Sequence, residues 1–127
     1  MARKNPPPPL HELEALVMEE VWNPGQATVR DVLTKLNRGE RQRAYTTVMT
    51  IMARLDEKGL LSRERQGKTD VYKPVMSRDA YRSARAQAEV AALVSEFGDV
   101  ALAQFAARVG ELDGKRLREL RKLAADE

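Results

Sequence analysis

The stretch that decides the fold runs from Ala44 to Gly59 and reads AYTTVMTIMARLDEKG. At about 100° per residue, its side chains separate into two arcs of a helical wheel. The apolar arc consists of Ala44, Val48, Ile51, Met52 and Leu55, and the opposite arc consists of Thr46, Thr47, Thr50 and Arg54. Hydroxyl, methyl and guanidinium groups at this spacing suit contacts with base edges and phosphates in a DNA major groove. A solvated face on an ordinary core helix is the alternative, so the flanking sequence must decide.

Two shorter helices are predicted before this stretch. Apolar residues recur at helical spacing from Leu10 to Trp22, and Asn23-Pro24-Gly25 ends that helix. Thr28 followed by Asp31 resembles a capping box and begins a second helix, which ends at Asn37-Arg38-Gly39. Three short helices in a row, the third with a polar outer face, fit a helix-turn-helix domain.

After Gly59 the pattern changes from a helical to a strand period. Leu61 to Gln66 and Thr69 to Val75 are predicted as two strands, joined by a tight turn at Gly67-Lys68 that gives the hairpin a basic tip. Pro74 fits an edge position, where no amide donor is needed. Residues 10–77 are therefore predicted to form a winged-helix domain. Its expected core consists of Leu13, Leu16, Val17, Val21, Val32, Leu33, Leu36, Val48, Met52, Leu55, Leu61 and Tyr72.

The segments on either side of this domain differ from it. Residues 1–9 contain four consecutive prolines and are expected to form a flexible arm. Residues 78–127 are predicted to form three more helices, divided at Gly98 and Gly110, with more apolar stripes than so short a region can bury alone. A two-fold symmetric homodimer would cover these stripes. The expected dimerisation residues are Leu93, Phe97, Leu102, Phe105, Leu117 and Leu120.

Composition narrows the classes of function. The chain of 127 residues carries 22 Lys and Arg against 19 Asp and Glu, and residues 30–73 hold 11 of the basic and 6 of the acidic side chains. This local excess favours a nucleic-acid partner. Cysteine is absent and His11 is the only histidine, so we predict no metal site and no cofactor. No set of His, carboxylate and Lys residues converges as an enzyme active site requires, and we expect no enzymatic activity.

No apolar run approaches the roughly 18 residues of a membrane-spanning helix, and the N-terminus lacks the apolar core of a signal peptide. The chain is therefore expected to be cytoplasmic, with no membrane partner.

Several motifs resemble the penicillinase-repressor and methicillin-resistance-repressor family of bacterial transcriptional regulators. The matching pieces are Leu13-Glu-Ala-Leu-Val-Met with Trp22, Thr28-Val-Arg-Asp-Val32, Ala44-Tyr-Thr-Thr-Val-Met-Thr50, Arg54-Leu with Lys58-Gly-Leu-Leu61, and Gly67 with Tyr72-Lys-Pro-Val75. Their order, spacing and identities agree over Leu10 to Ser77. Over Arg78 to Leu123 the resemblance is weaker and lies mostly in the apolar pattern.

The resemblance implies a homodimeric repressor that binds an inverted-repeat operator on double-stranded DNA in promoters of β-lactam-response genes. It also implies a membrane-bound sensor protease that triggers cleavage of the repressor in its C-terminal part. The family is cut at an Asn-Phe bond, and the matching bond here is Gln104-Phe105. A copper-responsive branch of the family carries a Cys-based metal motif, which this chain lacks.

The DNA-binding hypothesis gives each candidate residue a role. Thr46, Thr47 and Thr50 are expected to face the major groove together with Arg54, the best candidate for a bidentate guanine contact. The expected phosphate contacts are Arg30, Arg43, Arg63, Arg65 and Lys68. Arg63 and Arg65 share strand parity with Leu61, which leaves open that one of them packs its stem on the core. A winged-helix module that binds protein and not DNA is the alternative function, and the basic balance over residues 30–73 speaks against it.

Overall fold

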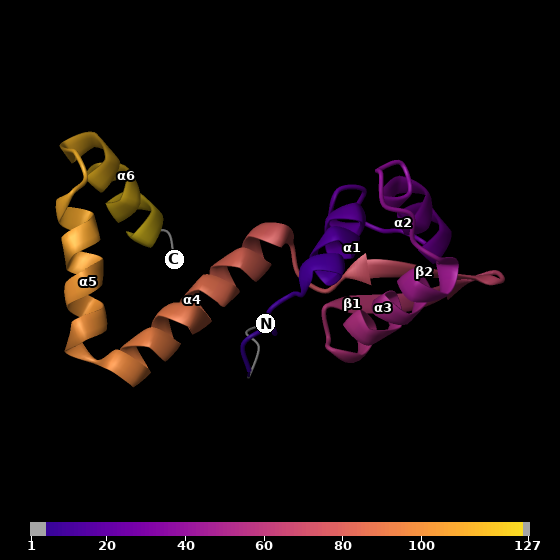
Figure 1. Cartoon of the computed structure of the whole chain (residues 1–127), viewed down its shortest axis with the longest axis horizontal. Helices are drawn as coiled ribbons and strands as arrows, with labels where there is room; N and C mark the ends of the chain where they lie inside the picture. The colour runs from indigo at the N-terminus through magenta and orange to yellow at the C-terminus, as the bar shows by residue number, and fades with distance from the viewer. Residues whose placement is uncertain (1–4, 126–127) are drawn as a thin grey trace. The chain divides into compact units, whose positions relative to one another are not determined.

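The computed structural model describes residues 5–125. Within them the chain forms helices and one two-stranded sheet, which confirms a mainly helical protein with a winged helix-turn-helix followed by a helical C-terminal region. The elements are α1 (Glu12–Trp22), α2 (Val29–Leu36), α3 (Tyr45–Glu57), β1 (Leu61–Gln66), β2 (Thr69–Pro74), α4 (Arg78–Phe97), α5 (Asp99–Gly110) and α6 (Gly114–Ala125) (Figure 1). None of these helices is long and apolar enough to cross a membrane.

Local chemistry sets the ends of the winged-helix elements. Thr28 Oγ1 accepts from the Asp31 amide at 3.0 Å, and Asp31 Oδ2 accepts from the Thr28 amide at 3.0 Å, so the predicted capping box starts α2. Gly59 adopts a φ of 81° just after α3. This left-handed conformation is readily available to glycine, and it lets the chain turn from the helix into β1.

The core of the winged helix lies between α1, α2, α3 and the sheet. Its buried side chains are Val17, Met18, Val21, Ala27, Val29, Val32, Val48, Met52, Leu55, Leu60, Leu61, Tyr72 and Tyr81. The prediction that Leu16 belongs to this core is wrong, because its side chain is 41% exposed. The buried side of α1 passes instead through Glu14, Val17, Met18 and Val21. Leu13 and Leu16 fit helical spacing equally well, but they lie off this stripe.

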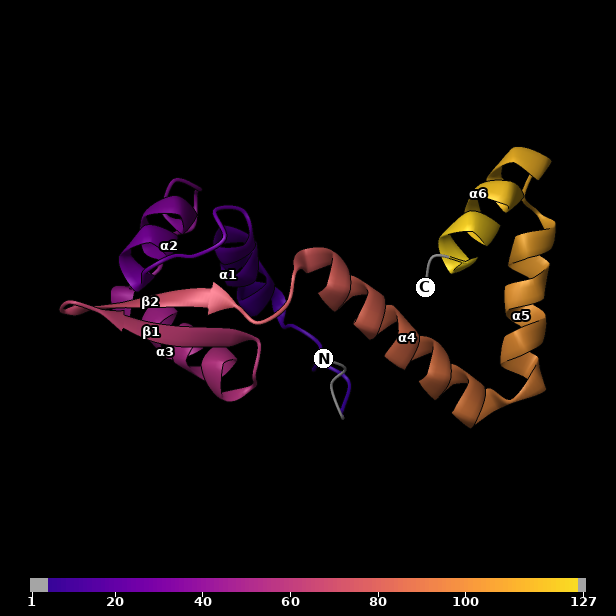
Figure 2. The ribbon, with the colours of Figure 1, turned by 180° about the vertical axis from the view of Figure 1, so that it is seen from behind.

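The hairpin pairs in antiparallel register from Leu61 opposite Pro74 to Gln66 opposite Thr69. The turn between the strands holds Gly67, with a φ of 64°, and Lys68. Ala27 forms a bridge with Tyr72 in which the two residues exchange backbone hydrogen bonds of 2.8 and 2.9 Å. This bridge joins the base of the hairpin to the loop before α2, while the turn projects beyond the helices (Figure 2).

The described part of the proline arm is packed and not free. Pro7 is fully buried, and the backbone carbonyls of Pro7 and Pro8 accept hydrogen bonds from side chains of α4. The expectation of a flexible arm is thus wrong for this part, while residues 1–4 lie outside the described residues. Proline cannot donate to a helix or a ladder, but its ring and its carbonyl can still contact a neighbouring helix.

The chain divides into two compact units, one ending at Ala86 and the other beginning at Gln87. This division falls inside α4 and later than the predicted boundary at Ser77, because Tyr81 belongs to the core of the first unit. The second unit contains the end of α4, α5 and α6. Asp113 caps α6, with its Oδ1 accepting from the Arg116 amide at 2.8 Å. Among the described residues of this unit, Ala101 alone is buried.

Candidate nucleic-acid interface

The outer face of α3 presents the predicted reading residues together. Thr46, Thr47, Thr50 and Arg54 are exposed and, with Ile51, line a shallow depression of about 330 Å³. Val48, Met52 and Leu55 on the opposite face are fully buried. Ala44, which was expected on the apolar face, lies exposed at the N-cap of the helix. The helix therefore has one face anchored in the core and one available to a ligand.

Arg54 has no competing partner in the described part of the chain. Across residues 5–125 neither an ion pair nor a hydrogen bond engages its guanidinium group. A guanidinium presents several donors in a planar fork, which fits the two acceptors of guanine in the major groove. The side chain is thus free for the contact that the sequence predicted, and this contact stays a prediction.

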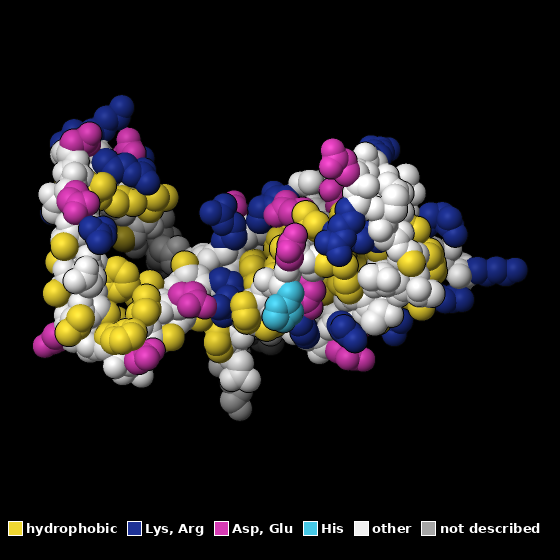
Figure 3. Space-filling view, viewed as in Figure 1, with side chains coloured by type: hydrophobic (Ala, Val, Ile, Leu, Met, Phe, Trp, Pro, Cys, Tyr) yellow, Lys and Arg dark blue, Asp and Glu magenta, His cyan; other side chains and the backbone are white. Residues whose placement is uncertain are grey.

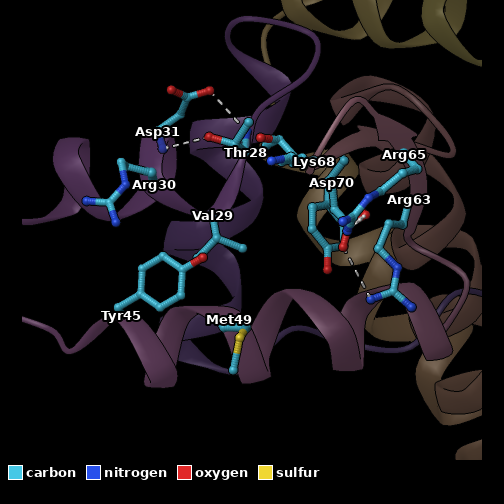
Figure 4. A pocket seen from close by; sticks show the side chains of 12 residues that line it. Thr28, Val29, Arg30, Asp31, Tyr45, Met49, Arg63, Arg65, Lys68 and Asp70 are labelled. Carbon is cyan, nitrogen blue, oxygen red and sulfur yellow. Dashed lines mark hydrogen bonds and ion pairs between the residues drawn. The ribbon is translucent and has the colours of Figure 1, made fainter.

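A second and larger depression, of about 560 Å³, lies between the starts of α2 and α3 and the wing (Figure 4). Four of the predicted phosphate-binding side chains line it, namely Arg30, Arg63, Arg65 and Lys68. Thr28, the N-cap of α2, and Asp31 in its first turn border it on one side, and the exposed side chains of Tyr45 and Met49 border it from α3. The tertiary structure thus gathers cations from separate elements around one groove that adjoins the exposed face of α3.

The aromatic ring of Tyr45 positions Arg30. The guanidinium carbon of Arg30 lies 5.5 Å from the centroid of this ring, which is a cation–π distance. Tyr45 is the first residue of α3, and Arg30 is in the first turn of α2. The contact holds the arginine beside the point where α3 begins. The sequence did not predict it, because the two residues belong to different helices.

The loop before α3 is braced by Asn37, whose role the sequence interpretation missed. Its Oδ1 accepts from the Arg43 amide at 2.8 Å, and its Nδ2 donates to the Arg43 carbonyl at 3.0 Å. Gln42 Nε2 donates to the carbonyls of Asn37 and Gly39 at 2.9 and 3.1 Å. Arg43 itself donates from Nη1 to the Arg41 carbonyl at 3.1 Å. The braced loop therefore presents Arg41 beside the start of α3 as a further exposed cation.

Two of the predicted phosphate contacts on the wing are already paired with acids. Arg65 Nη1 lies 3.2 Å from Asp70 Oδ1, and Arg63 lies 3.9 Å from Asp70 and 3.7 Å from Asp56. Tyr72, which is opposite Arg63 in the sheet, raises the pKa of Arg63 together with these two carboxylates, so this guanidinium stays charged. Lys68 in the turn has no such partner among residues 5–125. Within the described residues, Lys68 at the tip is therefore unpaired, whereas Arg63 and Arg65 along β1 are already paired with carboxylates.

Basic side chains outnumber acidic ones on the wing. Residues 61–74 contain four basic residues, Arg63, Arg65, Lys68 and Lys73, and two acidic residues, Glu64 and Asp70. Dark-blue Lys and Arg side chains reach the free end of the wing (Figure 3). This balance is the reverse of the neutral or acidic wing that a protein-interaction module without DNA binding would carry.

The predicted dimerisation residues lie on the second unit. Leu93, Phe97 and Leu102 are exposed by 41%, 51% and 52%, and Phe105, Leu117 and Leu120 are half-buried. Hydrophobic side chains gather on this unit (Figure 3), and the exposed set also includes Val90, Val100, Val109 and Leu123. The Gln104–Phe105 bond lies within α5. No cluster of three or more potential metal-binding side chains occurs in the described part of the chain.

Known proteins match this architecture and sequence. The family described as penicillinase repressor matches residues 10–126. The transcriptional regulator BlaI of Mycobacterium tuberculosis is 37% identical to the chain, over 86% of this chain and 80% of that protein. The solved DNA-binding domain of the repressor BlaI has a TM-score of 0.52 at 25% identity, covering 62% of this chain and 94% of that one.

A further solved structure shows the monomeric form of Bacillus licheniformis BlaI in complex with the blaP half-operator. It has a TM-score of 0.50 at 25% identity and covers 59% of this chain and 90% of that one. The family match extends through the winged helix and the second unit alike. The chain therefore belongs to the penicillinase repressor family of DNA-binding, winged-helix transcriptional repressors.

Proposed function

We propose that the protein represses transcription as a homodimer, with each winged helix bound to one half of an inverted-repeat operator. In this proposal α3 enters the major groove, where Arg54 reads a guanine and Thr46, Thr47 and Thr50 contact thymine methyls or phosphates. Arg30, Arg43 and Lys68 hold the phosphate backbone on either side of α3. Arg63 and Arg65 join them when DNA phosphates replace the carboxylates with which these arginines are paired.

The observation that carries this proposal is the pairing of an exposed Thr and Arg face on α3 with a basic groove beside it. The two features adjoin along α3, because Met49 lines the groove and Thr50 lines the outer face. A major-groove helix needs base-reading groups on its outer face and cations on its flanks, which is this arrangement. The BlaI complex with a half-operator supports the same use of the fold.

The exposed apolar side chains of the second unit support the homodimer. Phe97 and Leu102 are more than half exposed, and a second copy of the chain would cover apolar surface of this kind. Two-fold symmetry then matches an inverted repeat in the DNA.

The family relationship extends the proposal to the regulated genes and the signal. We propose promoters of β-lactam-response genes as targets and a sensor protease as the trigger, supported by the family match and by the blaP half-operator in the BlaI complex. Cleavage at Gln104–Phe105 would require α5 to unwind locally, since an extended strand is the form that protease clefts bind.

Selection of DNA from a randomised duplex pool tests the proposal. We expect the full-length protein to enrich an inverted repeat and to bind it with a steep salt dependence, since each phosphate contact adds about 0.9 to the slope of log affinity against log salt. Binding to the selected duplex and to its single half-site is measured by fluorescence anisotropy over a series of salt concentrations. Enrichment of no common sequence, or a slope near zero, would contradict DNA recognition by this protein.

A further inference from the structure

The start of α4 is held from two sides within the first unit. On one side lies the N-terminal arm, which contacts α4 through Pro7 and Pro8. The Tyr81 hydroxyl donates to the Pro8 carbonyl at 2.7 Å, and Arg85 Nη1 donates to the Pro7 carbonyl at 3.0 Å. Both donors belong to α4, one turn apart. Pro7 is as fully buried as the side chains of the hydrophobic core.

On the other side lies the end of α1. The rings of Trp22 and Tyr81 are 5.6 Å apart at a tilt of 45°, and Trp22 Nε1 donates to the Met76 carbonyl at 3.0 Å. Arg78 lies over the Trp22 ring at 5.7 Å and donates from Nε to Glu19 at 3.1 Å and from Nη2 to Asn23 at 2.6 Å. Tyr81 is therefore the residue on which the arm and α1 both converge.

The residue types suit a fixed contact. Proline restricts the backbone to an extended form before any contact is made, so its ordering on α4 costs little conformational entropy. The carbonyls of Pro7 and Pro8 stay available to accept hydrogen bonds because these two residues lie outside any helix or strand. Burial raises the pKa of Tyr81, and the hydroxyl therefore remains a proton donor at neutral pH. Extended proline segments are commonly linkers, whereas this one is built into the base of α4.

We propose that Pro7 and Pro8 form a latch that sets the direction in which α4 leaves the winged helix, and so sets the half-site spacing that a dimer accepts. This inference rests on the proposed homodimeric repressor. The latch could act on spacing because α4 is one uninterrupted helix from Arg78 to Phe97. The same helix carries the latched residue Tyr81 and, further on, Leu93 and Phe97 of the proposed dimer surface. A change in the tilt of its first turns would therefore change the distance between the two winged helices of a dimer.

Two truncations separate the latch from the charges of the arm. Removal of residues 2–5 deletes Arg3 and Lys4 and retains all four prolines, and removal of residues 2–9 deletes the prolines as well. Tyr81→Phe is a third variant, which keeps the ring beside Trp22 and removes only the donor to Pro8. Trp22 is the only tryptophan of the sequence, so its fluorescence reports whether the environment of Tyr81 has changed. Thermal unfolding identifies a variant that no longer folds.

The DNA series consists of the inverted repeat selected by the full-length protein, versions with one or two base pairs added or removed between the half-sites, and the single half-site. We expect removal of residues 2–9 to leave half-site binding unchanged and to weaken binding at the selected spacing about tenfold through lost effective concentration. The same variant should also discriminate less between the selected spacing and spacings that differ by one or two base pairs. Tyr81→Phe should give a smaller loss of the same kind, and removal of residues 2–5 should keep the preference.

Two results would overturn the latch. One is an unchanged spacing preference after removal of residues 2–9, in a protein whose wild-type form does discriminate between spacings. The other is an equal loss on the half-site and on the inverted repeat, which would make the arm a DNA contact. A third result would contradict the proposed function and not the latch alone. If the wild-type protein bound the half-site and the inverted repeat with the same affinity per site, there would be no cooperative dimeric operator complex.

Discussion

Asp70 and Arg65 face each other across the two strands of the wing, with 3.2 Å between Asp70 Oδ1 and Arg65 Nη1. The same carboxylate lies 3.9 Å from Arg63 Nη1. One acidic residue thus partly neutralises two cations that border the basic groove. Exposed ion pairs of this kind typically contribute less than about 1 kcal/mol to the free energy of unfolding. Their main effect is therefore to compete with DNA phosphates for the two arginines.

Asp70→Asn should strengthen DNA binding, because it frees Arg65, leaves Arg63 paired with Asp56, and removes a negative charge that repels phosphate. The expected gain is about three- to tenfold at low salt, on selected and random duplexes alike, with a steeper salt slope. Glu64→Gln is the matched control, since it removes the same charge from the Glu64–Lys73 pair on the same hairpin, away from the groove. An equal gain in both variants would mean that only the net charge of the wing matters.

Arg54→Ala and Lys68→Ala should differ in kind. Loss of a guanine contact at Arg54 should cost roughly 1–3 kcal/mol on the selected duplex and little on random DNA. Loss of the charge at Lys68 should weaken both duplexes equally, because an ammonium in the turn reads phosphate and not sequence. Competition assays with both duplexes make the comparison. Equal losses for Arg54→Ala would reassign it to the phosphate backbone, and a changed sequence preference for Lys68→Ala would make the wing a reader.

The ion pair between Glu14 and Lys58 should make stability depend on acid pH. Glu14 Oε2 lies 2.7 Å from Lys58 Nζ, and the Glu14 side chain is 8% exposed. Burial alone would raise the pKa of Glu14, but the hydrogen bonds from Lys58 and the His11 amide, with the charge of Lys58, outweigh it and leave the pKa lowered. The stabilisation is therefore present above the ordinary carboxyl pKa and is lost as pH falls through the lowered value.

Glu14→Gln should accordingly cost about 1 kcal/mol near pH 7, where the wild-type carboxylate is charged and hydrogen-bonded. The difference between wild type and variant should shrink as the pH falls below the carboxyl range, because Glu14 then becomes neutral too. Urea unfolding at neutral and acid pH measures it, with Glu12→Gln as a control on the exposed side of the same helix. A difference that is constant across pH would show that shape, and not charge, holds Glu14 in place.

Truncation should separate the winged helix from the dimer. We expect residues 1–86 to form a folded monomer that binds a half-site, because this fragment keeps Tyr81 against Trp22 and Arg78 against Glu19. Residues 1–77 should also be monomeric but less stable by about 2 kcal/mol, since the buried tyrosine is lost. Analytical ultracentrifugation and thermal unfolding of both fragments and the full chain decide this. A monomeric full chain, or a fragment that still dimerises, would place the dimer interface elsewhere.

The elements of this protein were predictable from the sequence because their signals are local. The helical period of residues 44–59, the Thr28–Asp31 capping box and the turn residues at Gly59 and Gly67 act within a few positions of the chain. The exposed face of α3 followed from the same period. Thr46, Thr50 and Arg54 project away from Val48, Met52 and Leu55 because 3.6 residues complete a turn.

The tertiary structure decided which of several equivalent surfaces and partners each element uses. Leu16 fits the helical period, but the side of α1 that packs into the core carries Val17, Met18 and Val21. Glu14 lies on that same side, where Lys58 from the end of α3 pairs with it. Arg65 and Lys68 carry the same charge, but Arg65 is paired because the strand register places it opposite Asp70. Lys68 lies in the turn and has no such partner in the described part of the chain. Four prolines in sequence predict an extended chain, but not that Tyr81 and Arg85 lie where they can bind its carbonyls. Each of these contacts joins residues far apart in sequence or opposite in a register, so packing had to bring the partners together before they could interact.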